Sequence, residues 1–141
     1  MEISAVKRRV LDTIERARRS AADRRAHADR ATSEFETFLN SVAAPILRQV
    51  ANVLRAQRYQ FSVSTPAGSV RLTSDRSAED YIELFLDTAG SRPVVIGHVS
   101  RARGRRVTES QRPIADRPVA ELTEEDVLEF VLKELEPFVE K

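Results

Sequence analysis

Cysteine is absent from this sequence of 141 residues, and only four glycines occur in it. Without cysteine, a disulfide framework, a thiol nucleophile and a cysteine-based metal site are all excluded. Neither Gly-x-x-x-x-Gly-Lys-[Ser/Thr] nor Gly-x-Gly-x-x-Gly is present, so the common nucleotide-binding loops are excluded too. Gly-x-Ser-x-Gly, the nucleophile motif of many hydrolases, is also missing.

Long hydrophobic runs are missing as well. No window approaches the roughly 18 consecutive apolar residues of a membrane-spanning helix. The first residues, MEISAVKRRV, lack the apolar stretch of a secretory signal. With 41% apolar and 32% charged residues, the composition suits a folded domain. We therefore expect a soluble, cytoplasmic protein that has no membrane partner.

Histidine is scarce, and its two copies do not form a metal-binding pattern. His27 and His98 stand alone, without HxH or HExxH spacing, so zinc is not expected. Among the acidic residues, Glu83 and Asp87 share one face of an expected strand but lie about 13 Å apart, which is too far to converge on one metal. We predict a protein that is not an enzyme, with no catalytic, cofactor or metal site.

Charge is nearly balanced over the whole chain but alternates along it. The net charge is +1, and all but three of the 23 basic residues are arginine. Residues 1–58 and 92–117 are basic, whereas residues 59–91 and 118–141 are acidic. Such alternation indicates either a partner of complementary charge or pairing between copies of the same chain.

The first 31 residues have the pattern of an extended helix with a narrow apolar stripe. Residues 3–31 contain no glycine or proline, and apolar residues recur at spacings of four and three, with Arg24 as the one basic interruption. We predict a helical arm at 1–31 that forms a coiled coil or holds a partner. The alternative is a helical hairpin folded back within the monomer. The candidate self-association residues are Val10, Ile14, Ala17, Ala21, Ala28, Ala31 and Phe35.

A more apolar helix follows, up to about residue 57. Ser33 and Glu36 fit a capping box, so either a new helix begins at Ser33 or the first helix continues through it. Pro45 lies inside this segment and is expected to kink or split it near Ala44.

The period of the apolar pattern then changes to two, which is typical of strands. Strands are expected at 59–64, 70–72, 81–87, 94–101 and, weakly, 105–110, with a turn at 65–68 and a linking loop at 111–119. A last helix begins after Thr123, with Asp126 completing its capping box and Leu122 and Val127 as its hydrophobic staple. Pro137 is expected to end or distort that helix.

The predicted fold class is α+β, with a long N-terminal helix or helical pair, a four- to five-stranded antiparallel meander, and a C-terminal helix packed on one face of the sheet. Residues 32–141 form its small α+β domain. The expected buried stripe of the last helix comprises Val127, Leu128, Val131, Leu132, Leu135, Phe138 and Val139.

The segment RARGRR at 101–106 is the most basic short stretch of the chain. Arginine-tipped hairpins can contact phosphate groups of nucleic acid. No aromatic residue interrupts the cluster, however, and a charged hairpin tip also protects a sheet against aggregation. The candidate nucleic-acid contacts are Arg101, Arg103, Arg105 and Arg106, with Arg18 and Arg25 of the first helix.

Two functions follow from these patterns. The favoured prediction is an adaptor-like interaction protein that forms a homo-oligomer or binds a protein partner through its N-terminal helix. The alternative is a nucleic-acid-binding module that uses the arginine-rich hairpin.

Overall fold

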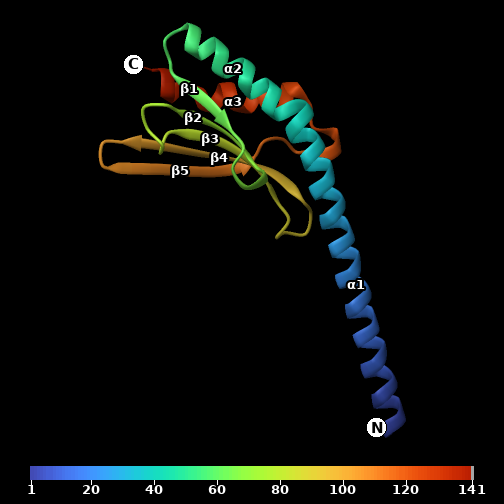
Figure 1. Ribbon diagram of the computed structural model, residues 1–141. Helices are drawn as coiled ribbons and strands as arrows, with labels where there is room; N and C mark the ends of the chain where they lie inside the picture. Colours follow the sequence, from blue (N-terminus) through green and yellow to red (C-terminus); the bar gives the residue numbers. More distant parts are fainter. Residues whose placement is uncertain (141) are drawn as a thin grey trace.

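Residues 3–56 form one helical path in the computed structural model, which describes residues 1–140 (Figure 1). Helix α1 (Ile3–Phe38) passes through a π-helical turn (Leu39–Ala43) into helix α2 (Ala44–Ala56). The second of the two alternatives at Ser33 is therefore correct. Ser33 lies inside α1, where its carbonyl accepts a hydrogen bond from the Thr37 hydroxyl (3.2 Å).

Proline explains why the path changes between α1 and α2. Pro45 has no N–H to donate to the carbonyl four residues earlier, and its ring crowds that carbonyl. The chain widens into the π-helical turn immediately before Pro45, which then stands in the first turn of α2. The expected distortion near Ala44 is thus confirmed.

The five strands form one antiparallel meander in the order β1-β2-β3-β4-β5. The strands are β1 (Phe61–Ser64), β2 (Val70–Ser74), β3 (Tyr81–Asp87), β4 (Val94–Arg103) and β5 (Arg106–Pro113). The predicted linking loop was wrong at its start, because residues 111–113 belong to β5. Strand β4 is ten residues long, so it offers pairing partners as far as Ile96, which lies opposite Pro113.

Helix α3 (Glu124–Val139) begins with the expected capping box, in which Thr123 and Asp126 bond to each other's backbone N–H. Of the two effects expected of Pro137, ending the helix is excluded, because α3 runs to Val139 and the lost hydrogen bond falls in its last turn. The expected buried stripe was wrong in part. Leu132 is 54% exposed, whereas Phe130 is only 2% exposed, so the buried stripe is rotated toward Phe130.

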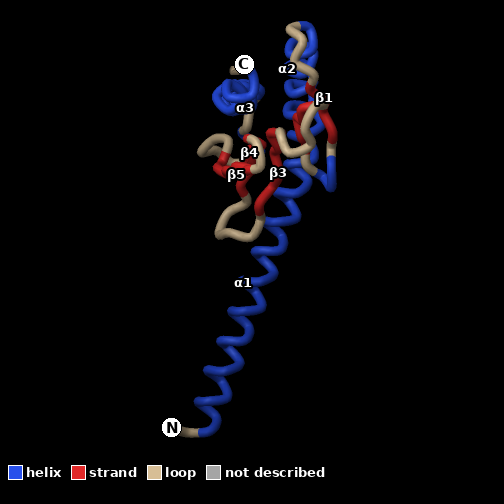
Figure 2. The backbone as a smooth tube through the Cα atoms, turned by 90° about the vertical axis from the view of Figure 1, so that its left-hand side faces the viewer, coloured by secondary structure: helices blue, strands red, loops and turns tan. Residues whose placement is uncertain are grey.

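The core lies between the sheet and two helices. Helices α2 and α3 both cover the same face of the sheet, as Figures 1 and 2 show from two directions. That face presents alternate residues of the strands, among them the fully buried Leu72, Ile82 and Leu84. The other face of the sheet carries no helix within residues 1–140.

The N-terminal part of α1 projects away from this body (Figure 2). Burial along α1 starts at Ala31, followed by Phe35 and Phe38. The 3-10 turn Val119–Glu121 lies against α1 near this point. No helix among residues 1–140 is long and apolar enough to cross a membrane.

Candidate functional sites

The projecting part of α1 exposes a group of large apolar side chains near its N-terminus. Val10 is 51% exposed and Ile14 is 39% exposed, although both are large enough to be favoured in a core. The same region exposes Ile3, Val6 and Leu11. Farther along α1 the stripe continues through Ala17, Ala21 and Ala28, which are small and permit close approach of a second helix.

Two of the predicted self-association residues are already covered by the chain itself. Ala31 is 5% exposed and Phe35 is 4% exposed. Phe35 belongs to the core, and its ring lies 6.0 Å from that of Phe38. These two residues therefore hold α1 to the body. They no longer count among the residues that are free to contact a partner.

The arginine-rich segment is a tight hairpin. Arg103 pairs with Arg106 at the ends of β4 and β5, which leaves Gly104 and Arg105 as a two-residue turn. Gly104 has a φ of +62°, while Arg105 does not have a positive φ. A positive φ at the first turn position alone is the pattern of a type II′ turn, for which glycine is favoured.

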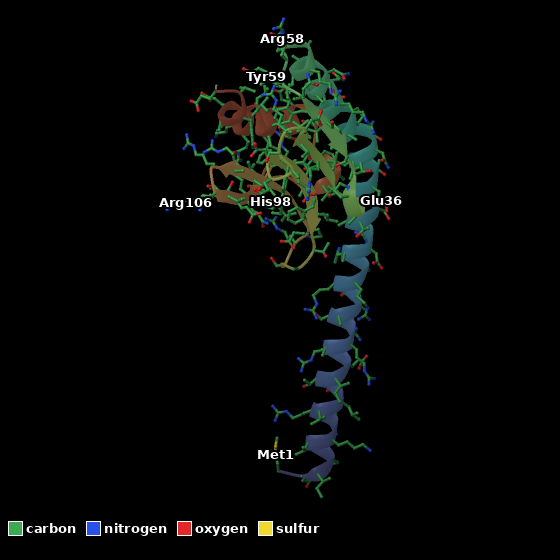
Figure 3. All side chains as sticks on the ribbon, turned by 60° about the vertical axis from the view of Figure 1, so that its left-hand side comes forward. Met1, Glu36, Arg58, Tyr59, His98 and Arg106 are labelled. Atoms are coloured by element: carbon green, nitrogen blue, oxygen red, sulfur yellow. The ribbon has the colours of Figure 1, made fainter. Side chains whose placement is uncertain are left out.

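This hairpin divides its arginines between two places. Arg101 and Arg103 line a pocket between the hairpin, the end of α2 and the end of α3. Arg105 and Arg106 are exposed at the tip, outside the lining of that pocket. Figure 3 shows Arg106 at the tip, with Arg58 and Tyr59 at the far end of the body from the N-terminus.

The pocket, hereafter the arginine pocket, has a volume of about 490 Å³. Arg58 follows α2, and Arg76 lies in the loop between β2 and β3, so residues distant in sequence meet here. Tyr59 and Phe138 add aromatic surface, which the sequence around RARGRR lacks. The whole lining comprises Arg58, Tyr59, Gln60, Phe61, Ser74, Arg76, Asp80, Arg101, Ala102, Arg103, Gly104, Pro137, Phe138 and Glu140.

The other two predicted nucleic-acid contacts lie elsewhere. Arg18 and Arg25 are exposed on the projecting part of α1. The hairpin points away from the body on the opposite side from α1 (Figure 1). The fold therefore does not bring the two halves of that predicted surface together.

The uncovered face of the sheet carries a ladder of partnered polar side chains. Arg71 on β2 bonds to Glu83 on β3 (2.9 Å), and its guanidinium lies 3.9 Å from the centre of the Tyr81 ring. The Tyr81 ring meets His98 edge-on at 5.4 Å, and His98 Nε2 lies 3.3 Å from Glu109 Oε1. Such cross-strand pairs stabilise a sheet, so His98 has a structural explanation.

In the part of the chain that the structure describes, two acidic side chains near the sheet bond singly to backbone N–H groups. Asp80 accepts a hydrogen bond from the Ala102 N–H (2.7 Å), and Asp87 accepts one from the Ala89 N–H (2.9 Å). Within residues 1–140, no three side chains of the metal-binding types form a group that could hold an ion.

Comparisons with protein-family models, with curated proteins and with solved structures find no match for this chain. Its function is therefore inferred from its own residues.

Proposed function

We propose that this protein is a cytoplasmic, non-enzymatic interaction protein that self-associates through the projecting part of α1. The observation that supports this proposal is the uncovered apolar stripe. Large apolar residues stand 39% to 87% exposed on a helix whose other positions are mostly charged. A second copy of the same helix would bury this stripe at heptad spacing, as in a coiled coil.

The energetics of an isolated helix support the same proposal. About 28 residues of α1 precede its first buried side chain, and most of their apolar positions are alanine. A helix of this polarity without tertiary contacts is marginal in water. Pairing supplies the packing that stabilises it.

A matched pair of variants tests the stripe. Ala21→Asp with Ala28→Asp places two carboxylates on the stripe. Ala22→Asp with Ala26→Asp adds the same charge to the same helix, but at positions turned away from the stripe at 100° per residue. We expect the first variant to weaken self-association by about tenfold or more, because an unpaired charge would have to be buried.

Sedimentation velocity over a range of micromolar concentrations measures this difference. The second variant is expected to associate as the unchanged chain does. A chain that sediments as a monomer at the highest concentration, or two variants with the same effect, would contradict the proposal.

The alternative proposal is nucleic-acid binding by the hairpin. It is supported by the exposure of Arg103, Arg105 and Arg106 at its tip. Its support is smaller, because Arg18 and Arg25 are held away from the tip. Fluorescence anisotropy with labelled duplex DNA, single-stranded DNA and RNA tests it. Binding that weakens with salt and is lost when Arg101, Arg103, Arg105 and Arg106 become alanine would favour this alternative.

A further inference from the structure

The arginine pocket gathers four cations from three separate parts of the chain. Arg58, Arg76, Arg101 and Arg103 line it, together with the carboxylates of Asp80 and Glu140. Among residues 1–140, none of these four arginines lies within 4.0 Å of a carboxylate. One of the two acids is engaged with the backbone, since Asp80 accepts the Ala102 N–H. The lining therefore carries four guanidinium groups and two carboxylates, an excess of positive charge that attracts an anion.

Arg58 stands where another residue would fit the backbone better. Helix α2 ends in a Schellman motif, in which the Arg58 N–H donates to the Arg55 carbonyl (3.0 Å) and the Tyr59 N–H to the Leu54 carbonyl (2.8 Å). In this motif Arg58 adopts a φ of +70°, the left-handed region that favours glycine. A long cation thus occupies a glycine position at the rim of the pocket.

Arg101 is the least exposed of the four arginines that line the pocket, since Arg58, Arg76 and Arg103 are exposed. It is half-buried on β4, next to the residue whose N–H is bonded to Asp80. Tyr59, which also lines the pocket, is held by its own hydrogen bond, from its hydroxyl to the Val139 carbonyl (3.2 Å). The lining therefore combines guanidinium groups with an aromatic ring that a hydrogen bond anchors.

We propose that the arginine pocket binds a phosphoryl group, carried either by a nucleotide or by the 5′ end of a nucleic-acid strand. Guanidinium groups form paired, charge-assisted hydrogen bonds with phosphate oxygens, and several around one pocket suit a multiply charged anion. A volume of about 490 Å³ is within the range of small-molecule sites and is large enough for more than a bare phosphate ion. This inference does not depend on self-association through α1.

The hairpin offers its own matched control. Arg101→Gln with Arg103→Gln removes two charges that line the pocket. Arg105→Gln with Arg106→Gln removes two charges from the same hairpin, outside the pocket. Both variants have the same net charge, so a general electrostatic attraction would weaken equally in both.

The direct test is competition against a ribose-labelled fluorescent ATP on the full chain at low and moderate salt. We expect inorganic triphosphate and ATP to displace the probe and adenosine to leave it bound. We expect the pocket variant to bind the probe about tenfold or more weakly, as for the loss of a charge-assisted hydrogen bond, and the tip variant to bind it nearly as the unchanged chain does.

Two oligonucleotides distinguish the two possible carriers of the phosphoryl group. A short oligonucleotide with a 5′-phosphate is compared with the same strand ending in a 5′-hydroxyl. Tighter binding of the phosphorylated strand than of both the 5′-hydroxyl strand and ATP assigns the pocket to a nucleic-acid end, whereas tighter binding of ATP than of the phosphorylated strand assigns it to a nucleotide. Equal weakening by the pocket and tip variants, or no binding of ATP, triphosphate or the phosphorylated strand even at low salt, overturns the proposal.

Arg58→Gly separates binding from folding. Glycine is favoured at this φ, so the unfolding temperature should stay the same or rise while the fluorescent ATP binds more weakly. Unchanged binding in this variant and in Arg76→Gln would overturn the assignment of these two residues to the site.

Discussion

At the scale of single residues, Gly97 determines how closely α3 approaches the sheet. It lies in β4 and faces Phe130 of α3, whose ring occupies the space of a side chain at position 97. A Cβ atom built on Gly97 would lie 2.1 Å from the Phe130 Cζ. The glycine is needed here for space and not for backbone conformation, since its φ is not positive.

Gly97→Ala is therefore expected to destabilise the protein by about 1–3 kcal/mol through overpacking. The matched control is Gly90→Ala, where the nearest atom to the new Cβ, the Arg92 carbonyl oxygen, is 3.9 Å away. That change should stay within about 0.5 kcal/mol. Urea unfolding followed by circular dichroism measures both. Equal effects of the two substitutions would contradict the role given to Gly97.

At the scale of elements, the start of α3 is fixed by a capping box between Thr123 and Asp126. Thr123 accepts from the Asp126 N–H (3.3 Å), and the Asp126 carboxylate accepts from the Thr123 N–H (2.9 Å). These bonds satisfy two backbone donors that a helix start would otherwise leave free. Arg117 lies 3.8 Å from the same carboxylate, which joins the preceding loop to the helix.

Thr123→Ala should cost about 1 kcal/mol of stability, because one of those donors loses its acceptor. Thr123→Ser keeps a hydroxyl at the same place and should retain most of that stability. The midpoint of urea unfolding distinguishes the two. If serine is as destabilising as alanine, the hydroxyl is not what stabilises the helix start.

At the scale of the whole molecule, the body and the projecting part of α1 differ in what holds them. The body has a contiguous core between one face of the sheet and the helices α2 and α3. The projecting part of α1 has a single ion pair among its side chains, between Glu15 and Arg19 (2.8 Å), within residues 1–140. Exposed pairs at this spacing contribute only about 0.3–0.5 kcal/mol.

Amide hydrogen exchange should therefore separate the two parts. If α1 pairs as proposed, amides of residues 5–28 will be protected more strongly as protein concentration rises, whereas amides of β3 will keep the same protection. Mass spectrometry of exchanged peptides measures this. Protection of residues 5–28 that does not change with concentration would contradict pairing through α1.

Much of the fold follows from local patterns in the sequence. The uninterrupted helical spacing before Pro45, the alternation in strand β3, and the Thr123–Asp126 capping box each depend on neighbours within a few residues. Such features are readable because helix and strand periods place nearby side chains on defined faces. The end of β5 and the buried face of α3 were predicted less well, because pairing with β4 and packing against Gly97 decide them.

The sequence by itself determined the order of the elements, the α+β class and the presence of an apolar stripe on α1. Only the tertiary structure decided which stripe residues stay free, since Ala31 and Phe35 meet the core while Val10 and Ile14 do not. It also decided that Arg58, Arg76, Arg101 and Arg103 share one pocket. No local signal connects residues so far apart in the chain, because packing of α2, the sheet and α3 brings them together.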